Sequence, residues 1–356
     1  MEMLDVLIGA AWSGLLNVWD YLSAHVLTCL IPAFFIAGAI SAFIKKDVIL
    51  KYLGPDVKKT ISYPIASVSG AVLAVCSCTI LPMFAGLYKK GSGVGPATAF
   101  LYSGPAINIL AIIYTANILG FELGLARAVA AVAMAFVIAF LMSYLFKTHD
   151  EETSKNNKNT SVNDNGPKRS KWVKLSVFVL LIAILVTGTA GISWALKIGI
   201  IYLFSMAIAV ILIYYYETYE VTEWGYETWD LTKKIFPILI VGTFIVGVIA
   251  YFLPPETFRP YLGDNSLLSS FFGSIIGAIL YMPTLLEVPI IGTTFGYNSG
   301  VMGDAPALSL LLAGPSLSLP NMIVLFRIMK SKHWLAYIGI VVVLSTLMGF
   351  TYGMIV

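Results

Sequence analysis

Long apolar runs constrain this chain more than any other feature of its sequence. About ten runs of roughly 20 residues contain few or no charged side chains, and a helix of about 20 apolar residues crosses the hydrocarbon core of a bilayer. Of the 356 residues, 58% are hydrophobic and 12% are charged, whereas a soluble domain carries about 25% charged residues. The sequence therefore predicts an all-α integral membrane protein.

The runs predict where the chain crosses the membrane. Residues 3–20 are interrupted by Asp5, Asn17 and Asp20, so this stretch either lies along the interface or adds one more span. The expected spans are 22–44, 61–88, 97–118, 122–146, 173–190, 193–216, 233–253, 266–295, 305–328 and 334–354.

One segment differs in kind from the apolar runs. Residues 149–170 are polar and show no apolar periodicity, which is typical of a disordered linker. The sequence thus predicts an N-terminal helix, a first half, this linker, two connecting helices, an acidic segment and a second half. Their bounds are 1–21, 22–146, 147–172, 173–216, 217–232 and 233–354.

The two halves share an internal repeat. Upstream, residues 70–73 match 277–280 at an offset of 207, and residues 52–54 match 261–263. The strongest block recurs at an offset of 210, with Gly93, Pro96, Ala97, Leu101, Gly104 and Pro105 repeated as Gly303, Pro306, Ala307, Leu311, Gly314 and Pro315. Three blocks in one order predict two copies of one structural unit.

The distribution of Lys and Arg indicates how the copies are oriented. If 61–88 and 266–295 are complete spans, the 22 basic residues divide 11 to 11 between the two sides. If both are re-entrant hairpins, 19 share one side, and only Arg127, Lys197 and Arg259 lie on the other. Because cytoplasmic loops carry an excess of Lys and Arg, the hairpins are favoured. The fold is then about eight full transmembrane helices plus two re-entrant helical hairpins arranged as two inverted repeats, as in many secondary transporters.

The tip of the first hairpin carries candidate binding groups. It reads Cys76, Ser77, Cys78, Thr79 and, three residues on, Pro82. Proline lacks an N–H and favours a break, and the hydroxyl groups can satisfy the backbone groups that a break frees. Non-helical backbone at membrane depth needs surrounding protein or a cavity, so a substrate site is expected here.

The thiols leave two interpretations open. Cys76 and Cys78 suit a soft metalloid or metal ion, because soft ligands select soft ions, and Cys29 could add a third thiol. Alternatively, membrane cysteines behave as small apolar residues.

The second hairpin tip carries a carboxylate instead of thiols. Glu287 lies between Pro283 and Pro289, and a charged side chain at bilayer depth costs roughly 2.5–3.5 kcal/mol. Glu287 should therefore face a cavity. It either couples transport to protons or hydrogen-bonds the broken backbone.

Two Gly-Pro pairs lie in the middle of equivalent spans. Gly104-Pro105 and Gly314-Pro315 should kink their helices near the hairpin tips. Polar side chains follow each pair and either line the same cavity or pack helices together; they are Asn108, Ser316, Ser318 and Asn321.

The remaining charges near span ends are expected at the membrane interface. They are Glu122, Arg127, Lys197 and Asp304. The chain has no basic stripe with interleaved aromatics, so nucleic acid is not an expected partner, and no G-x-x-x-x-G-K-[ST] motif, so ATP hydrolysis is not expected. We expect no cofactor.

The stretch from Val75 to Asn108 resembles a known family. Its pattern of C-x-C, proline, G-x-x-K-K-G and G-P-x-x-N is similar to that of the predicted-permease family that includes the YraQ-like proteins and ArsP, the trivalent organoarsenical efflux permeases. The likeness extends loosely over the whole chain. It implies a bacterial or archaeal inner-membrane permease in which Cys76 and Cys78 match the cysteine motif.

The leading hypothesis is a secondary permease, not an enzyme, that moves a small thiophilic or sulfur-containing solute, with methylarsenite as one candidate. Its partners are that solute and the lipid bilayer, and it could form a homodimer. The rivals are an uptake permease for a small anion, a scaffold, and a membrane thiol oxidoreductase. Redox pairs are usually spaced C-x-x-C, and a disulfide between Cys76 and Cys78 would be strained.

Overall fold

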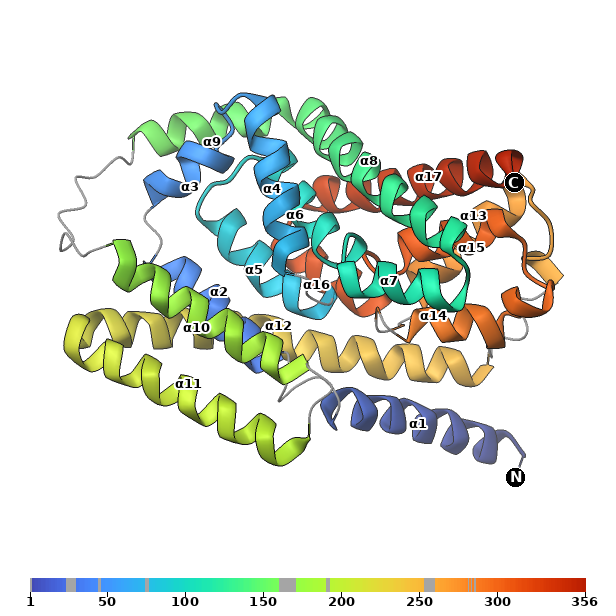
Figure 1. Ribbon diagram of the computed structural model, residues 1–356, viewed down its shortest axis with the longest axis horizontal. Coiled ribbons are helices and arrows are strands. Elements are labelled where there is room, and N and C mark those ends of the chain that lie inside the picture. Colours follow the sequence, from blue (N-terminus) through green and yellow to red (C-terminus); the bar gives the residue numbers. More distant parts are fainter. Residues whose placement is uncertain are drawn as a thin grey trace.

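The structure is a computed structural model that describes residues 2–23, 30–43, 46–73, 77–159, 171–189, 193–252, 260–280, 282, 284 and 286–356. Every regular element in these ranges is helical, as the sequence predicts. Figure 1 shows the helices gathered in one body, with α1 at its edge.

The helices of the first half are α1 (Glu2–Tyr21), α2 (Ile31–Phe43), α3 (Lys46–Leu53), α4 (Lys59–Leu73), α5 (Ser77–Lys89), α6 (Val94–Ala106), α7 (Ile109–Ile118), α8 (Phe121–Leu145) and α9 (Lys147–Asn159). The middle and second half contain α10 (Lys171–Thr189), α11 (Trp194–Tyr215), α12 (Thr218–Phe252), α13 (Leu267–Ile279), α14 (Glu287–Pro289), the π-helix η3 (Ile290–Thr294), the 3-10 helix η4 (Tyr297–Ser299), α15 (Asp304–Ala313), α16 (Leu319–Ile328) and α17 (Ser331–Ile355).

Fewer helices are long enough to cross a membrane than the sequence predicts. In the described ranges, α8, α11, α12 and α17 are long and apolar enough by themselves. A fifth span results if α6 and α7, which meet at a bend of 41°, are counted together. Several predicted spans are instead divided into shorter helices. For example, α15 ends at Ala313, directly before Gly314-Pro315, and α16 begins at Leu319.

The two sequence copies form equivalent contacts. The backbone N–H of Gly93 donates to the carbonyl of Leu53 at 2.9 Å, and that of Gly303 donates to the carbonyl of Leu262 at 2.9 Å. Helices α7 and α16 have ten residues each, and α8 and α17 have 25 each. The repeat thus extends from sequence blocks to helix lengths and hydrogen bonds.

Equivalent glycines allow close helix packing in both copies. A methyl group on Gly70 of α4 would lie 3.0 Å from the nitrogen of Gly104, and one on Gly277 of α13 would lie 3.0 Å from the nitrogen of Gly314. Small residues let helix backbones approach closely in membranes. This packing brings each Gly-Pro pair against the helix that precedes the predicted hairpin tip of its own copy.

One contact between the two copies joins α6 to α15. The hydroxyl of Tyr102 lies 3.4 Å from the carbonyl oxygen of Leu312, and Tyr102 and Leu312 are repeat equivalents at the offset of 210. The centre of the molecule is therefore built from both copies.

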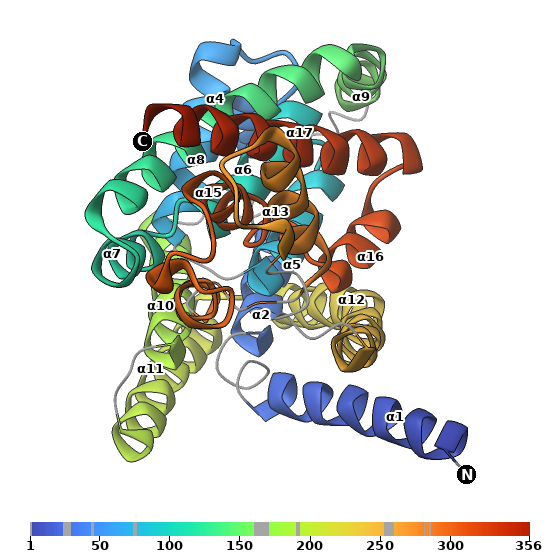
Figure 2. The ribbon, with the colours of Figure 1, turned by 90° about the vertical axis from the view of Figure 1, so that its right-hand side faces the viewer.

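Four helices lie beside this core. Figures 1 and 2 place α1 along α12, with α10 and α11 paired next to them. The side chain of Asn17 donates to the carbonyl of Thr243 at 2.9 Å, and Ser13 donates to that of Gly247 at 2.9 Å. Residues 218–232 of the predicted acidic segment are the start of the 35-residue helix α12, so this segment is not separate from the span that follows.

The predicted disordered linker begins instead as a helix. Helix α9 docks on the first copy, because Asp150 accepts a hydrogen bond from the backbone N–H of Val94 at 2.9 Å and Ser154 donates to Asp56 at 2.5 Å. Composition gives no sign of these tertiary contacts. Residues 160–170 lie outside the described ranges.

Candidate functional site

Arg127 of α8 is the largest side chain that is fully buried, with 0% of it exposed. Its Nη1 donates to the Thr115 hydroxyl of α7 at 2.8 Å, and that hydroxyl donates in turn to the carbonyl of Ala111 at 2.7 Å. The expectation that Arg127 lies at the interface is therefore wrong. Arg127 lies six residues into α8, about 9 Å along the axis, and its guanidinium is in the packed interior of the protein.

Glu287 of α14 faces Arg127. Its Oε2 lies 3.6 Å from Nη2 of Arg127, and both side chains are 0% exposed. Neither carboxylate oxygen accepts a hydrogen bond from any described residue, and Nε and Nη2 of Arg127 donate none. The two charges thus form an ion pair without a hydrogen bond between them.

A glycine makes room for the carboxylate. A methyl group on Gly314 would lie 2.7 Å from Oε1 of Glu287. In the first copy, a methyl group on Gly104 would lie 2.8 Å from Cδ1 of Ile80, and Ile80 is the equivalent of Glu287 at the offset of 207. The same packing niche therefore holds an apolar side chain in one copy and a carboxylate in the other.

The pair joins the two copies at high energetic cost. Arg127 belongs to the first copy and Glu287 to the second. Taking each ion out of water costs several kcal/mol, which mutual attraction offsets only when the geometry is good and the remaining donors and acceptors are satisfied. Ionisable groups at membrane depth mark substrate pathways and proton relays. The arrangement suits the binding or transfer of a proton or a charged solute.

The predicted thiol site is only partly described. Cys29 and Cys76 lie outside the described residues, as does the side chain of Cys78 in α5. The neighbouring Ser77 and Thr79 are buried, with exposed fractions of 8% and 0%.

The prolines differ in their local structure. Pro82 lies inside α5 rather than at a break, which membrane helices tolerate because nearby hydroxyl groups and neighbouring helices satisfy the freed backbone groups. Pro289 ends α14 and leads into the π-helix η3. Pro105 lies in the last turn of α6, just before the 41° bend, and Pro315 lies between α15 and α16. Pro283 is outside the described ranges.

The other predicted polar residues have different environments. Asn108 caps α7 by accepting from the N–H groups of Leu110 and Ala111. Ser316 contacts the Tyr102 carbonyl at 3.5 Å, next to the contact between α6 and α15. Ser318 and Asn321, at the start of α16, are buried and their side chains have no hydrogen-bond partner among the described residues.

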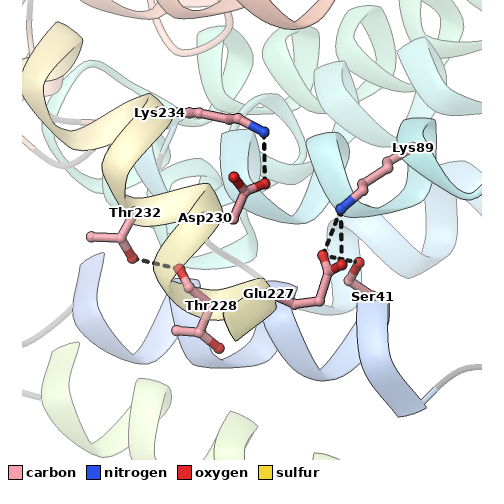
Figure 3. Close-up of polar contacts among 7 residues, drawn as sticks. All are labelled: Ser41, Lys89, Glu227, Thr228, Asp230, Thr232 and Lys234. Atoms are coloured by element: carbon pink, nitrogen blue, oxygen red, sulfur yellow. Dashed lines mark hydrogen bonds and ion pairs between the residues drawn. The ribbon is translucent and has the colours of Figure 1, made fainter. Parts of the chain in front are cut away.

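A second ion pair, which the sequence analysis misses, lies at the ends of α2, α5 and α12. Lys89 and Glu227 are 2.7 Å apart, and the Ser41 hydroxyl donates to the same carboxylate at 2.7 Å (Figure 3). Both charged side chains are partly exposed. The signal that could have identified Arg127 is different, because an ionisable residue inside an apolar run of 25 is by default a functional candidate.

Comparisons with known proteins cover nearly the whole chain. A family profile described as "Predicted permease" matches residues 11–354. The chain is 38% identical over 368 residues to the UPF0718 protein MJ0584 of Methanocaldococcus jannaschii, covering 100% of this chain and 97% of that protein. It is 24% identical over 303 residues to the UPF0718 protein YraQ of Escherichia coli, covering 84% and 70%. No solved structure matches the chain.

Proposed function

This chain belongs to the predicted permease family, and from that premise we propose that it is a secondary transporter that moves a small solute by alternating access. Family membership and the long apolar helices indicate a multi-pass membrane transporter. The single observation that carries the proposal further is the buried Arg127–Glu287 pair, contributed by the two copies. A buried ion pair is costly, and ionisable groups at membrane depth typically bind a solute or transfer a proton.

The architecture we propose is about eight transmembrane helices and two re-entrant hairpins in two inverted repeats. The recurrent contacts of Gly93 and Gly303, and of Gly70 and Gly277, support two equivalent units. The placement of 19 of the 22 Lys and Arg residues on one side supports the inverted orientation, with the basic loops and residues 147–172 on the cytoplasmic side. Alternating access then requires one copy to rock against the other around a central site.

The solute we propose is small and thiophilic or sulfur-containing, with trivalent organoarsenicals such as methylarsenite as candidates for efflux. Cys76 and Cys78, with Cys29 as a third thiol, would bind it, because soft ligands suit soft ions. Ser77, Thr79 and the polar groups that follow the two Gly-Pro pairs would line the path. Glu287 would couple the cycle to protons.

The direct test is accumulation of methylarsenite in everted membrane vesicles. Wild-type vesicles should accumulate it, and the variant Cys76→Ser/Cys78→Ser should lose accumulation while its folded yield stays unchanged. Equal accumulation in both would remove the thiol site. Everted vesicles distinguish efflux from uptake, because only an exporter loads them.

Coupling through Glu287 has its own measurement. Replacement by glutamine keeps the shape of the side chain and removes the titrating proton. Transport by Glu287→Gln should therefore become independent of external pH. Transport that stays fully pH-dependent would exclude Glu287 as the coupling group.

The rival functions make different predictions. A thiol oxidoreductase would turn over a disulfide substrate in detergent, without a closed vesicle, whereas a permease would not. A scaffold would give no solute flux across a broad panel in reconstituted vesicles. A homodimer would be visible as twice the protomer mass in the purified protein.

A further inference from the structure

The guanidinium of Arg127 has one side whose N–H group is hydrogen-bonded, the fixed side, and one side whose N–H groups are not, the free side. Nη1 is held by Thr115 at 2.8 Å, whereas Nε and Nη2 donate to no described residue. Nε and Nη2 form one edge of the planar guanidinium, and this fork fits two oxygens of a carboxylate or another oxyanion. The fixed side sets the direction in which this edge points, so the edge is pre-oriented before any partner binds.

Glu287 stands opposite this edge without occupying it. A charge-assisted hydrogen bond between a guanidinium and a carboxylate measures about 2.7–2.9 Å, but the closest approach here is 3.6 Å. Both carboxylate oxygens also lack any other hydrogen bond within the described part of the chain. The Arg127 edge is thus neutralised in charge by Glu287, but its hydrogen-bonding capacity is unused.

Few other ionisable groups interact with Arg127 and Glu287. Tyr102 of α6 interacts electrostatically with both Arg127 and Glu287, and Tyr337 of α17 interacts with Tyr102. Both tyrosines are fully buried, and a phenol, whose usual pKa is about 10, carries no charge at neutral pH. Among the described residues, the charge balance of this centre is therefore set by one cation and one carboxylate.

We propose that the free edge of Arg127 binds a small oxyanion in a bidentate manner and that Glu287 is its internal competitor, so that one proton accompanies each anion. This inference rests on the proposed permease function and names the substrate class as small oxyanions. Sulfur oxyanions are among the sulfur-containing solutes of that proposal. A bound monoanion and an ionised Glu287 would place two negative charges beside one positive charge in a dry interior. Glu287 therefore takes a proton from the solution on the entry side, and no bond of the anion is broken.

Binding to the purified protein in detergent tests the site. Thiosulfate, sulfite and arsenate serve as three oxyanions of different shape, and the melting temperature is measured at acidic and at alkaline pH. At least one should stabilise the wild type, and more strongly at acidic pH, where the competitor is neutral. With thiosulfate, whose charge is the same at both pH values, Glu287→Gln should be stabilised equally at both, because its side chain no longer competes.

Two variants distinguish the contribution of the Arg127 hydrogen-bonding edge to anion binding from the contribution of its charge. Arg127→Lys keeps the charge and loses the fork, so the apparent affinity should fall by about tenfold or more. Arg127→Gln/Glu287→Gln replaces both charges with neutral side chains and avoids an unpaired buried charge. It should fold and show no stabilisation by any of the three anions.

Transport in proteoliposomes tests the coupling. A pH gradient should drive accumulation of the stabilising anion by the wild type. Glu287→Gln should retain anion exchange and lose gradient-driven accumulation. Weaker anion binding by Glu287→Gln than by the wild type would overturn the competitor role.

The inference and the proposed function fail in different ways. Methylarsenite flux without stabilisation by any of the three anions would overturn the oxyanion site and leave the permease in place. Absence of flux for methylarsenite and for all three anions would overturn the permease, and the inference would fall with it.

Discussion

Among the described residues, two ion pairs join distant parts of the chain, and they differ in geometry and in environment. Lys89 and Glu227 approach to 2.7 Å with side chains that are 49% and 24% exposed. Arg127 and Glu287 remain 3.6 Å apart with both side chains fully buried. The shorter pair, Lys89 and Glu227, contributes less to stability, because water screens exposed charges. Breaking the longer pair costs more, because a buried charge that loses its partner has no solvent to replace it.

Removing one member of the buried pair should have the largest effect. Arg127→Met leaves Glu287 as an isolated buried carboxylate and should destabilise the protein by about 3–5 kcal/mol. A thermal melt of the detergent-purified variant measures this loss of stability as a lower melting temperature. Arg127→Met/Glu287→Leu should recover most of that loss, because no unpaired charge remains; if it melts as low as the single variant, the cost arises from packing instead.

A third carboxylate, Asp150 of α9, accepts a hydrogen bond but forms no ion pair with any residue that the structure describes. Burial raises the pKa of Asp150 from the usual 3.8 to about 6, and the hydrogen bond from Val94 and the charge of Lys59 partly oppose the rise. The folded state therefore holds the proton more tightly than the unfolded state, and its stability falls as the pH rises from about 4 to about 6. The decrease should reach about 2–3 kcal/mol.

Proteolysis of the α9 segment as a function of pH measures this effect. Cleavage of the wild type should increase across that interval and level off above it. Asp150→Asn, which cannot ionise, should remove the change. A wild-type profile that is flat, or that moves in the opposite direction, would show that undocking of α9 is not governed by Asp150.

Adding a methyl group at each of the two equivalent glycines distinguishes the role of one copy from that of the other. Gly314→Ala would place Cβ 2.7 Å from Oε1 of Glu287, and Gly104→Ala would place it 2.8 Å from Cδ1 of Ile80. Both should lose about 1–3 kcal/mol through overpacking. Only Gly314→Ala displaces the carboxylate, so it should impair solute flux far more than Gly104→Ala at equal folded yield. Equal flux defects would indicate a general packing effect.

The smallest effect is expected at the exposed pair. Lys89→Gln should change the stability by less than about 1 kcal/mol, and the difference should shrink further at high salt. Melting temperatures at low and high ionic strength check this. A loss comparable to that of Arg127→Met would contradict the contrast between the two pairs.

The sequence by itself determined the features that depend on local composition and short-range geometry. Apolar runs without charges predict membrane helices, and every regular element of the described chain is helical. The two Gly-Pro pairs predict interruptions, and the chain leaves α-helical geometry after Ala106 and Ala313. Glu287 stood out because a carboxylate is costly inside an apolar run.

Tertiary structure decided which of these groups meet. Arg127 looked interfacial because it lies near the start of its span, and only the packing of α8 against the second copy places it beside Glu287. Asn108 was a candidate either for the cavity or for helix packing, and the structure shows that its side chain caps α7. The helix α9 formed because contacts from Val94 and Asp56 offset its poor composition. Local sequence encodes propensity and burial, whereas partners far apart along the chain are selected by how the two copies pack.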